Sequence, residues 1–369
     1  MPFSSFTGNA ATLRHLREAL AAGRLPHALI LAGPRGAGKY TLALMLAQAA
    51  NCLTPPSSPD GLPDFCGVCS NCRRIAESLD LDARCAEAVA AREELRDADK
   101  RDTRILIQTH PDVLVIPPDP PQLLIKIGQV RTLTREIYRV PAEARRAFSI
   151  FTSAAFMKEA ANALLKVLEE PPAHATIVLL AENPGELLPT IRSRAPIVRL
   201  GALPAAQIEQ VLADHRRDLE PAERALIARL SEGAIGRALS FDLPAWLASR
   251  ADALVLLRSS VQDADLSSLF RITETYRAGA EGQEKTDALL RTAASLLEDL
   301  LLLKAGTPQL VRNIDLQREL ATLASTVTLE WIEAAARGLR QVESGMRRNL
   351  LRSLALDSFA TSLAEQPSR

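Results

Sequence analysis

The stretch that decides the fold runs from His27 to Tyr40 and reads HALILAGPRGAGKY. Its first half is a short apolar run, which is typical of a strand buried on both faces of a sheet. Its second half has the spacing of a glycine loop, whose backbone N–H groups bind phosphate at the start of a helix. The residues that we expect to form this phosphate cradle are Gly33, Gly36, Gly38 and Lys39.

The loop lacks the hydroxyl that usually follows its lysine. A Ser or Thr at that position binds Mg²⁺, but here the position is Tyr40, and Thr41 comes one residue later. We keep Thr41 as a candidate nucleotide-binding residue of a degenerate site, although it should point elsewhere on the helix. The loop is therefore either a nucleotide site or a remnant retained for folding, and binding of ATP or ADP stays open.

ATP hydrolysis also needs carboxylates at the end of a core strand, one for Mg²⁺ and one to orient water. The strand that we predict at 147–151 is followed by Thr152 and Ser153, which carry no carboxylate. Asp112 is the rival acid, but it precedes its strand, so we interpret it as a surface or turn residue. Two parts of the hydrolytic site are thus absent, which argues against autonomous ATP turnover.

Apolar strand-like runs alternate with helix-like segments between residues 13 and 200. This alternation predicts an α/β fold with a parallel sheet. The predicted strands are 27–32, 113–116, 147–151, 176–180 and 197–200. The predicted helices are 41–51, 129–138 and 158–169. Between Cys52 and His110 we expect a small insertion with a surface helix, because that segment interrupts the sheet pattern with a turn, a cysteine cluster and a charged stretch.

Beyond Pro204 the strand signals stop. A first helical unit precedes the turn at 233–237, and a second, larger helical domain should run from about residue 244 to the end. Within it the apolar residues of 289–301 recur at helical spacing, with Glu298 and Asp299 expected on the other face.

Four of the five cysteines lie close together in the sequence. Cys66, Cys69 and Cys72 are separated by two-residue spacers, and with Cys52 they supply the four thiolates of a closed tetrahedral Zn²⁺ site. We predict a structural zinc ion that stabilises the insertion, with Cys85 left as a free thiol. The alternative is that the four are unrelated reduced cysteines.

The 369 residues are 47% hydrophobic, enough for two or three domains. Because 44 Lys and Arg balance 44 Asp and Glu, bulk charge does not demand a polyanionic partner. No apolar run approaches the ~20 residues that span a bilayer, and the N-terminal stretch MPFSS lacks the basic segment followed by an apolar run that is typical of an export signal. We therefore expect a cytoplasmic protein without membrane contacts.

Several motifs together carry a family resemblance. They are HA at 27–28, the four cysteines, HPD at 110–112, NALLKVLEEPP at 162–172, IRSR at 191–194 and GRA at 236–238. With these motifs the chain resembles the delta-prime family of clamp-loader subunits of bacterial DNA polymerase III, which are AAA+ proteins. The resemblance covers almost the whole chain. One departure is Ala195, which stands where the family's Ser-Arg-Cys motif has Cys. Another is the charged stretch at about 78–108, which looks longer than the family's short link and has no assigned function.

The resemblance implies an AAA+ domain at 1–203 with a zinc insertion at about 52–109, a helical lid at 204–243 and a C-terminal helical collar at 244–369 for oligomerisation. It also implies that Arg194 is an arginine finger acting in trans on a neighbour's ATP, and that Arg237 belongs to a second sensor motif. The implied partners are motor and delta subunits in a hetero-pentameric ring, with the sliding clamp and primer-template DNA reached through that ring. The chain would then be a non-hydrolysing component of the polymerase holoenzyme.

Two other functions compete with this one. The first is an autonomous P-loop ATPase or kinase, in which Thr41 and an acid from elsewhere in the fold complete the metal site. Within the family it corresponds to a motor-type clamp-loader subunit, which would keep an intact loop and an Asp-Glu pair in the position of Thr152 and Ser153. The second is a zinc-dependent DNA-binding module that presents Arg73 and Arg74. Zero net charge and the lack of aromatic stacking residues beside the cysteines count against the second.

Overall fold

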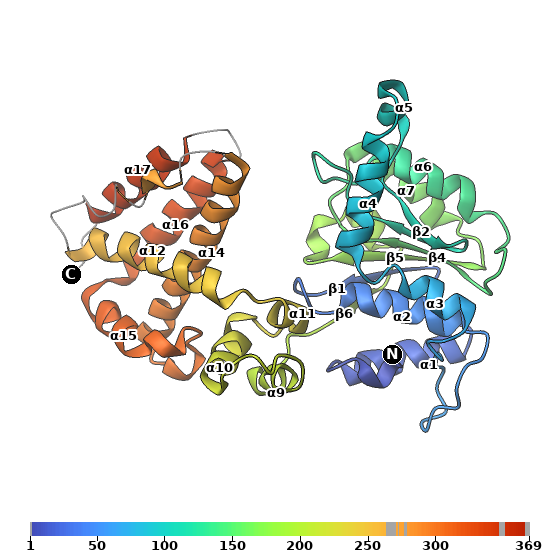
Figure 1. Cartoon of the computed structure of the whole chain (residues 1–369), viewed down its shortest axis with the longest axis horizontal. Coiled ribbons are helices and arrows are strands. Elements are labelled where there is room, and N and C mark those ends of the chain that lie inside the picture. The colour runs from blue at the N-terminus through green and yellow to red at the C-terminus, as the bar shows by residue number, and fades with distance from the viewer. Residues whose placement is uncertain (1, 263–270, 272, 277–278, 347–350, 366–369) are drawn as a thin grey trace. The chain divides into compact units, whose positions relative to one another are not determined.

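The computed structural model describes residues 2–262, 271, 273–276, 279–346 and 351–365 (Figure 1). The chain divides into two units. The first comprises Met1–Pro204 with Gly233–Arg237, and the second comprises Ala205–Glu232 with Ala238–Arg369. No helix within the described ranges is long and apolar enough to cross a membrane.

A six-stranded sheet forms the centre of the first unit, in the order β2-β3-β4-β5-β1-β6. All neighbouring strands are parallel except β2, which pairs antiparallel with β3. The predicted α/β fold with a parallel sheet is confirmed, and the edge strand β2 is an addition that the sequence pattern did not predict. The strands are β1 (Ala28–Ala32), β2 (Ile107–His110), β3 (Val113–Ile116), β4 (Ala147–Phe151), β5 (Ala175–Ala181) and β6 (Ile197–Arg199).

Helices cover both faces of this sheet, as Figure 1 shows for α2 and α3 on one side and α6 and α7 on the other. Alternate residues of β1 join different cores, because successive side chains of a strand point to opposite faces. Leu29 and Leu31 belong to the core with α1, α2 and α3, whereas Ile30 and Ala32 belong to the core with α6, α7 and α8. The helical segments of this unit are η1 (Phe3–Ser5), α1 (Ala10–Ala21), α2 (Lys39–Asn51), α3 (Ser70–Ala76), α4 (Leu81–Glu93), α5 (Asp97–Asp102), α6 (Ile127–Ile137), α7 (Lys158–Glu169), η2 (Pro184–Glu186) and α8 (Pro189–Arg192).

Helix α7 has the bounds that the sequence predicted. Ala160, Ala161, Leu164, Val167 and Leu168 are its buried residues, and they recur at the spacing of one helix face. The helix ends before the two prolines that follow Glu170, because proline cannot continue a helix and restricts the residue before it. Its last residue therefore lies at the edge of the sheet where β5 begins.

The charged insertion forms α4 and α5, and α4 has no fully buried residue. The predicted surface helix is nevertheless fixed to the sheet unit by a charge pair. Arg92 Nη1 lies 2.6 Å from Asp119 Oδ1, and the Asp119 side chain is fully buried. Lys126 Nζ lies 3.6 Å from the same oxygen, so two cations offset one buried carboxylate.

The second unit is all helical within the residues that the structure describes. Its core contains the fully buried Trp331. Parts of the predicted collar at 263–270, 272, 277–278, 347–350 and 366–369 lie outside the described residues. The helical segments are α9 (Ala205–His215), α10 (Pro221–Leu230), α12 (Leu243–Gln262), α14 (Gly279–Lys304), η3 (Pro308–Leu310), η4 (Ile314–Leu316), α15 (Gln317–Thr326), α16 (Leu329–Met346) and α17 (Arg352–Ala364); α11 (Ile235–Leu239) spans the boundary between the units.

The apolar stripe predicted on α14 is present, but one polar assignment was wrong. Asp299 is fully buried and not on the solvent face. Its carboxylate accepts the backbone N–H groups of Arg312 and Asn313 at 2.8 and 2.9 Å. The helical pattern could not reveal this because the donors come from a loop after the helix. Leu301, at the edge of the stripe, is 46% exposed.

Asp112, which we interpreted as a surface or turn residue, holds the turn before β4. Its carboxylate accepts the backbone N–H groups of Ala142, Glu143 and Ala144 at 2.7, 2.8 and 2.7 Å. Burial alone would raise the pKa of Asp112, but these three bonds outweigh it and hold the pKa below its ordinary value. The charged form of Asp112 therefore stabilises the fold.

We predict that Asp112→Asn lowers the free energy of unfolding by about 2 kcal/mol at pH 7, since bonds to a charged acceptor are lost. The folded-state pKa is depressed, so this stabilisation is present above the ordinary value of 3.8 and is lost as pH falls through the folded pKa. Urea unfolding of both proteins between pH 7 and pH 3 measures the difference. Asp97→Asn, on an almost fully exposed side chain, is the control. A difference independent of pH would contradict this account.

Candidate functional site

The glycine loop joins the end of β1 to the start of α2. Gly36 and Gly38 have φ values of +81° and +83°, in the left-handed region that favours glycine. A Cβ atom on Gly36 would lie 2.6 Å from the backbone nitrogen of Arg237, and one on Gly38 would lie 2.9 Å from the Phe6 ring. Both glycines are thus required by close packing as well as by conformation.

The structure brings the predicted second sensor motif against this loop. The N–H of Gly236 donates to the carbonyl of Gly36 at 2.8 Å, and Arg237 follows directly. At the other end of the loop, a Cβ atom on Gly33 would lie 2.6 Å from the carbonyl oxygen of Leu200. The loop therefore contacts Gly236 and Arg237 near its middle and Leu200 at its start.

Lys39 folds back onto the loop that precedes it. Its Nζ donates to the carbonyl oxygens of Gly33 and Pro34 at 2.6 and 2.8 Å. Burial lowers the pKa of Lys39, partly offset by the nearby carboxylates of Glu182 and Glu186. A phosphate bound here would have to replace the two carbonyls as the partner of the ammonium group.

Tyr40 directs its hydroxyl to the insertion. The Tyr40 hydroxyl donates to the carbonyl of Ser78 at 2.6 Å, and the ring packs against the core of α1, α2 and α3. Burial raises the pKa of Tyr40. Thr41 is half-buried and lies about 100° further round the helix than residue 40. Tyr40 therefore anchors the segment between α3 and α4, and its hydroxyl is engaged there.

The residues that follow β4, where hydrolysis usually needs carboxylates, are Thr152 and Ser153. After β4, the N–H of Thr152 donates to the carbonyl of Ile116, and the Ser153 hydroxyl accepts from the Ala155 N–H at 3.1 Å. Sequence reasoning missed Glu182, which follows β5, the strand next to β1. Its position directly after a predicted parallel strand could have revealed it, because the carboxyl ends of parallel strands meet at one edge of a sheet.

Arg194 lies at the opposite edge of the sheet from the glycine loop. It precedes β6, which is parallel to β1 with Ile30 aligned to Ile197, so it lies near the amino ends of both strands. The glycine loop follows the carboxyl end of β1, one strand length or roughly 16 Å away. Arg194 is therefore separated from the loop of its own chain.

The guanidinium group of Arg194 is held at the surface by three contacts. Its Nη2 lies 2.7 Å from Glu169 Oε1, and its Nη1 donates to the Thr190 carbonyl at 2.9 Å and to the Ser193 hydroxyl at 3.4 Å. The side chain remains 35% exposed. No motif or spacing in the sequence predicted the contact between Glu169 and Arg194.

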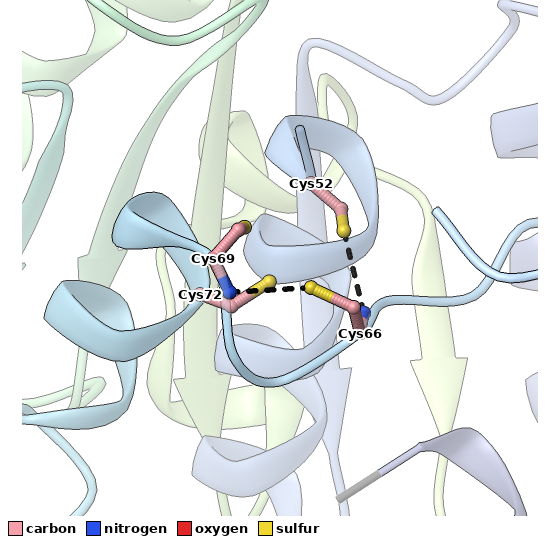
Figure 2. Close-up of side chains that lie close together, drawn as sticks. All are labelled: Cys52, Cys66, Cys69 and Cys72. Carbon is pink, nitrogen blue, oxygen red and sulfur yellow. Dashed lines mark hydrogen bonds between the residues drawn. The ribbon is translucent and has the colours of Figure 1, made fainter. Parts of the chain in front are cut away.

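The four predicted cysteines converge at the end of α2 and the start of α3, and Figure 2 shows their sulfurs facing a common point. All four Sγ atoms lie within 4.8 Å of one another. Zn–S bonds of about 2.3 Å in a tetrahedron imply sulfur separations of about 3.8 Å, so this group fits a metal ion such as zinc. Cys85, on α4, lies outside the group.

Backbone N–H groups already point at the sulfurs. Cys66 N–H donates to Cys52 Sγ at 3.3 Å, and Cys69 N–H donates to Cys66 Sγ at 3.3 Å (Figure 2). A bond from the Thr54 hydroxyl, aided by the backbone N–H groups of Val68 and Cys69, lowers the pKa of the Cys66 thiol to about 6. Burial instead raises the pKa of Cys52 and Cys72. A divalent cation favours the thiolate form of all four.

The cysteine group is tied to the sheet through Asn51, the residue before Cys52. Its Oδ1 accepts the backbone N–H groups of Arg145 and Arg146 at 3.1 and 3.0 Å, where the chain enters β4. Asn71 on α3 donates in turn to the Asn51 carbonyl at 3.1 Å. The cluster therefore stabilises the start of a central strand.

Arg73 and Arg74, which the DNA-binding alternative would use to contact nucleic acid, differ in their surroundings. Arg73 is exposed, but Arg74 forms an ion pair with Glu143 that raises the pKa of its guanidinium and lowers the pKa of Glu143. Of the two arginines that this alternative names, only Arg73 is exposed, whereas a nucleic-acid surface normally gathers several cations.

Known proteins resemble this chain along most of its length. Residues 8–204 match the family model described as "DNA polymerase III, delta subunit". The delta-prime subunit of Escherichia coli is 28% identical over 317 residues, covering 85% of this chain and 80% of that protein. The delta-prime subunit of Bacillus subtilis is 30% identical over 220 residues, covering 59% and 55%.

Two further proteins are similar to this chain, one in sequence over a smaller share of its own length and one in structure with a low TM-score. The tau subunit of DNA polymerase III from Escherichia coli is 30% identical over 243 residues, which cover 64% of this chain and 32% of that protein. The chain thus spans about a third of the length of that relative. A gamma subunit-related protein from Thermotoga maritima aligns over 97% of this chain and 100% of its own with 20% identity and a TM-score of 0.41. Because the family model covers more than half of the residues, the chain belongs to the DNA polymerase III delta subunit family, and the delta-prime resemblance inferred from its motifs is confirmed.

Proposed function

We propose that this chain is a non-hydrolysing clamp-loader subunit that supplies Arg194 to the ATP site of a neighbouring motor subunit. The observation that carries the proposal is the position of Arg194, which lies half-exposed at the sheet edge opposite its own glycine loop. An arginine so placed is available to a second chain and not to its own loop.

The chemistry required of such an arginine is electrostatic. Negative charge on the transferred phosphoryl group is stabilised by a guanidinium that approaches from outside, and measured fingers accelerate hydrolysis by about 10³ to 10⁵. The planar fork of a guanidinium group suits the geometry of phosphate oxygens. The family membership supports a partner that binds ATP, and we propose that motor and delta subunits form a hetero-pentameric ring with this chain in the cytoplasm. The sliding clamp and primer-template DNA would be reached through that ring.

The domain roles follow from this assembly. We propose that residues 1–203 form the AAA+ domain, with the lid at 204–243 and the collar at 244–369 providing oligomer contacts. Zinc at Cys52, Cys66, Cys69 and Cys72 would be structural, because four protein thiolates close the coordination sphere and leave no position for a substrate.

The carboxylates near Lys39 favour one competing function, an autonomous ATPase. Glu182 and Glu186 act electrostatically on Lys39, so carboxylates are present near the loop even though β4 supplies none. An autonomous ATPase could use one of them to hold Mg²⁺. Against it, Tyr40 occupies the position of the metal-binding hydroxyl and its own hydroxyl is bonded to Ser78.

Substitution of Arg194 tests the main proposal. In a complex reconstituted with motor and delta subunits, Arg194→Ala should slow hydrolysis at the ATP site it serves by about 10³-fold or more, with unchanged ring assembly. DNA-stimulated phosphate release and single-turnover rates measure this. Arg192→Ala removes the same charge from an exposed neighbour and should retain the rate. An unchanged rate for Arg194→Ala would rule the finger out.

Titration with nucleotide separates the two functions. We expect no ATP turnover by the purified chain and no strengthening of ATP binding by Mg²⁺, because the loop lacks the hydroxyl that links metal to phosphate. Calorimetric titration with and without Mg²⁺ measures the affinity, with Lys39→Ala as the control for binding at the loop. Binding that tightens with Mg²⁺ and turnover that Glu182→Gln abolishes would favour the autonomous ATPase.

Metal analysis tests the cysteine site. The purified chain should contain one zinc ion, and Cys69→Ser should lose it and melt roughly 5 °C lower or more, since 1 kcal/mol corresponds to about 2–4 °C in a domain of this size. Elemental analysis and thermal unfolding provide the two measurements. Cys85→Ser, outside the cluster, is the matched control and should retain the metal. A chain that melts at the same temperature after Cys69→Ser would disprove a structural role.

A further inference from the structure

Glu169 is the carboxylate closest to the arginine on which the proposed function depends. It is the last residue of α7, and its Oε1 accepts from Arg194 Nη2 at 2.7 Å. The two side chains come from segments 25 positions apart that meet at the amino edge of the sheet. Packing of α7 against α8 brings them together: Leu164 and Leu168 of α7 and Ile191 of α8 belong to the same core.

This ion pair has little value for the stability of the fold. The Glu169 and Arg194 side chains are 51% and 35% exposed, and pairs of this exposure contribute little to folding because water and salt screen them. A surface carboxylate so close to an arginine instead limits where the guanidinium can go. A free arginine side chain samples many rotamers, and ordering it at the moment of reaction would cost entropy.

The remaining contacts define one orientation of the guanidinium group. Nη1 is bonded to the Thr190 carbonyl and the Ser193 hydroxyl, both on the segment that carries Arg194 itself. Glu169 is the contact that comes from a different helix, so it fixes the side chain relative to the rigid part of the unit. Nε has no hydrogen-bond partner within the part of the chain that the structure describes, which leaves a donor for an incoming phosphate oxygen.

We propose that Glu169 is a positioning residue that holds the guanidinium of Arg194 in the orientation in which it meets a neighbour's phosphate. This inference rests on the proposed function, because it assumes that Arg194 acts on ATP in an adjacent chain. Glu169 itself touches no substrate, and its effect passes entirely through Arg194. The rival role for the same contact is a latch that keeps the arginine away from the neighbour.

The test compares variants in the complex reconstituted with motor and delta subunits. Glu169→Ala should lower kcat for DNA-stimulated ATP hydrolysis at the served site by about ten-fold, with little change in KM, since misplacing a catalytic group mainly affects the transition state. Glu169→Gln keeps an acceptor oxygen and should recover part of the rate. Glu170→Ala, the adjacent exposed carboxylate, is the matched control and should behave like the unmodified chain.

A double-mutant cycle distinguishes positioning from an independent effect. If Glu169 acts only through Arg194, then Glu169→Ala should have no further effect in an Arg194→Ala background. Two results would overturn the positioning role in favour of a general structural role. One is a further loss of rate when Glu169→Ala is added to Arg194→Ala, as large as its loss alone. The other is a loss of rate in Glu169→Ala that is accompanied by a lower melting temperature of the free chain. A higher kcat for Glu169→Ala would overturn it in favour of a latch.

The outcome for Arg194→Ala separates failure of this inference from failure of the proposed function. If Arg194→Ala is inactive at the served site while Glu169→Ala retains the full rate, only the positioning role fails. If Arg194→Ala retains the full rate, the finger assignment fails and the role of Glu169 fails with it.

Discussion

The parallel pairing of β1 with β5 and β6 is the constraint on which the rest of the first unit depends. Because the three strands run in the same direction, every segment that follows them lies at one edge and every segment that precedes them lies at the other. The glycine loop and Glu182 share the first edge, and Glu169 and Arg194 share the second. Complete burial of β1 and β5 on both faces fixes this arrangement, since a register change would expose apolar side chains to water.

The two edges differ in how tightly they are built. At the loop edge, glycines contact backbone atoms of Leu200 and Arg237 closely enough that no Cβ atom fits without a shift. At the other edge, Arg194 is held by one carboxylate and by its own segment, and it is partly exposed. A closely packed edge resists change, whereas an exposed charge pair can exchange partners at small cost. This contrast supports a division in which the loop edge stabilises the unit and the arginine edge meets other molecules.

Tyr40 shows how the loss of a catalytic group can be offset by a structural gain. The residue stands where a metal-binding hydroxyl is usual, yet its own hydroxyl bonds to the carbonyl of Ser78 and its half-buried ring packs against the core. Replacing it with Ser would supply the small hydroxyl but would leave a cavity and free the Ser78 carbonyl, which is costly in a buried region. The substitution therefore couples the loop to the insertion that carries the cysteines.

The sequence predicted those features that depend on local pattern. The buried strands, α7 and the four cysteines were found because apolar periodicity, a proline stop and two-residue spacers are signals within a short window. Strand β2 was missed because it has four residues at the edge of the sheet, its middle residues Gln108 and Thr109 are polar and not buried, and it follows a charged segment. Asp299 was missed because its donors are backbone N–H groups of a loop after the helix, which the helical pattern does not include. The pair of Glu169 with Arg194 was missed because the two residues are 25 positions apart and the packing of α7 against α8 brings them together. The binding elements of a site of this kind can therefore be read from sequence motifs, whereas the contacts that orient them depend on tertiary structure.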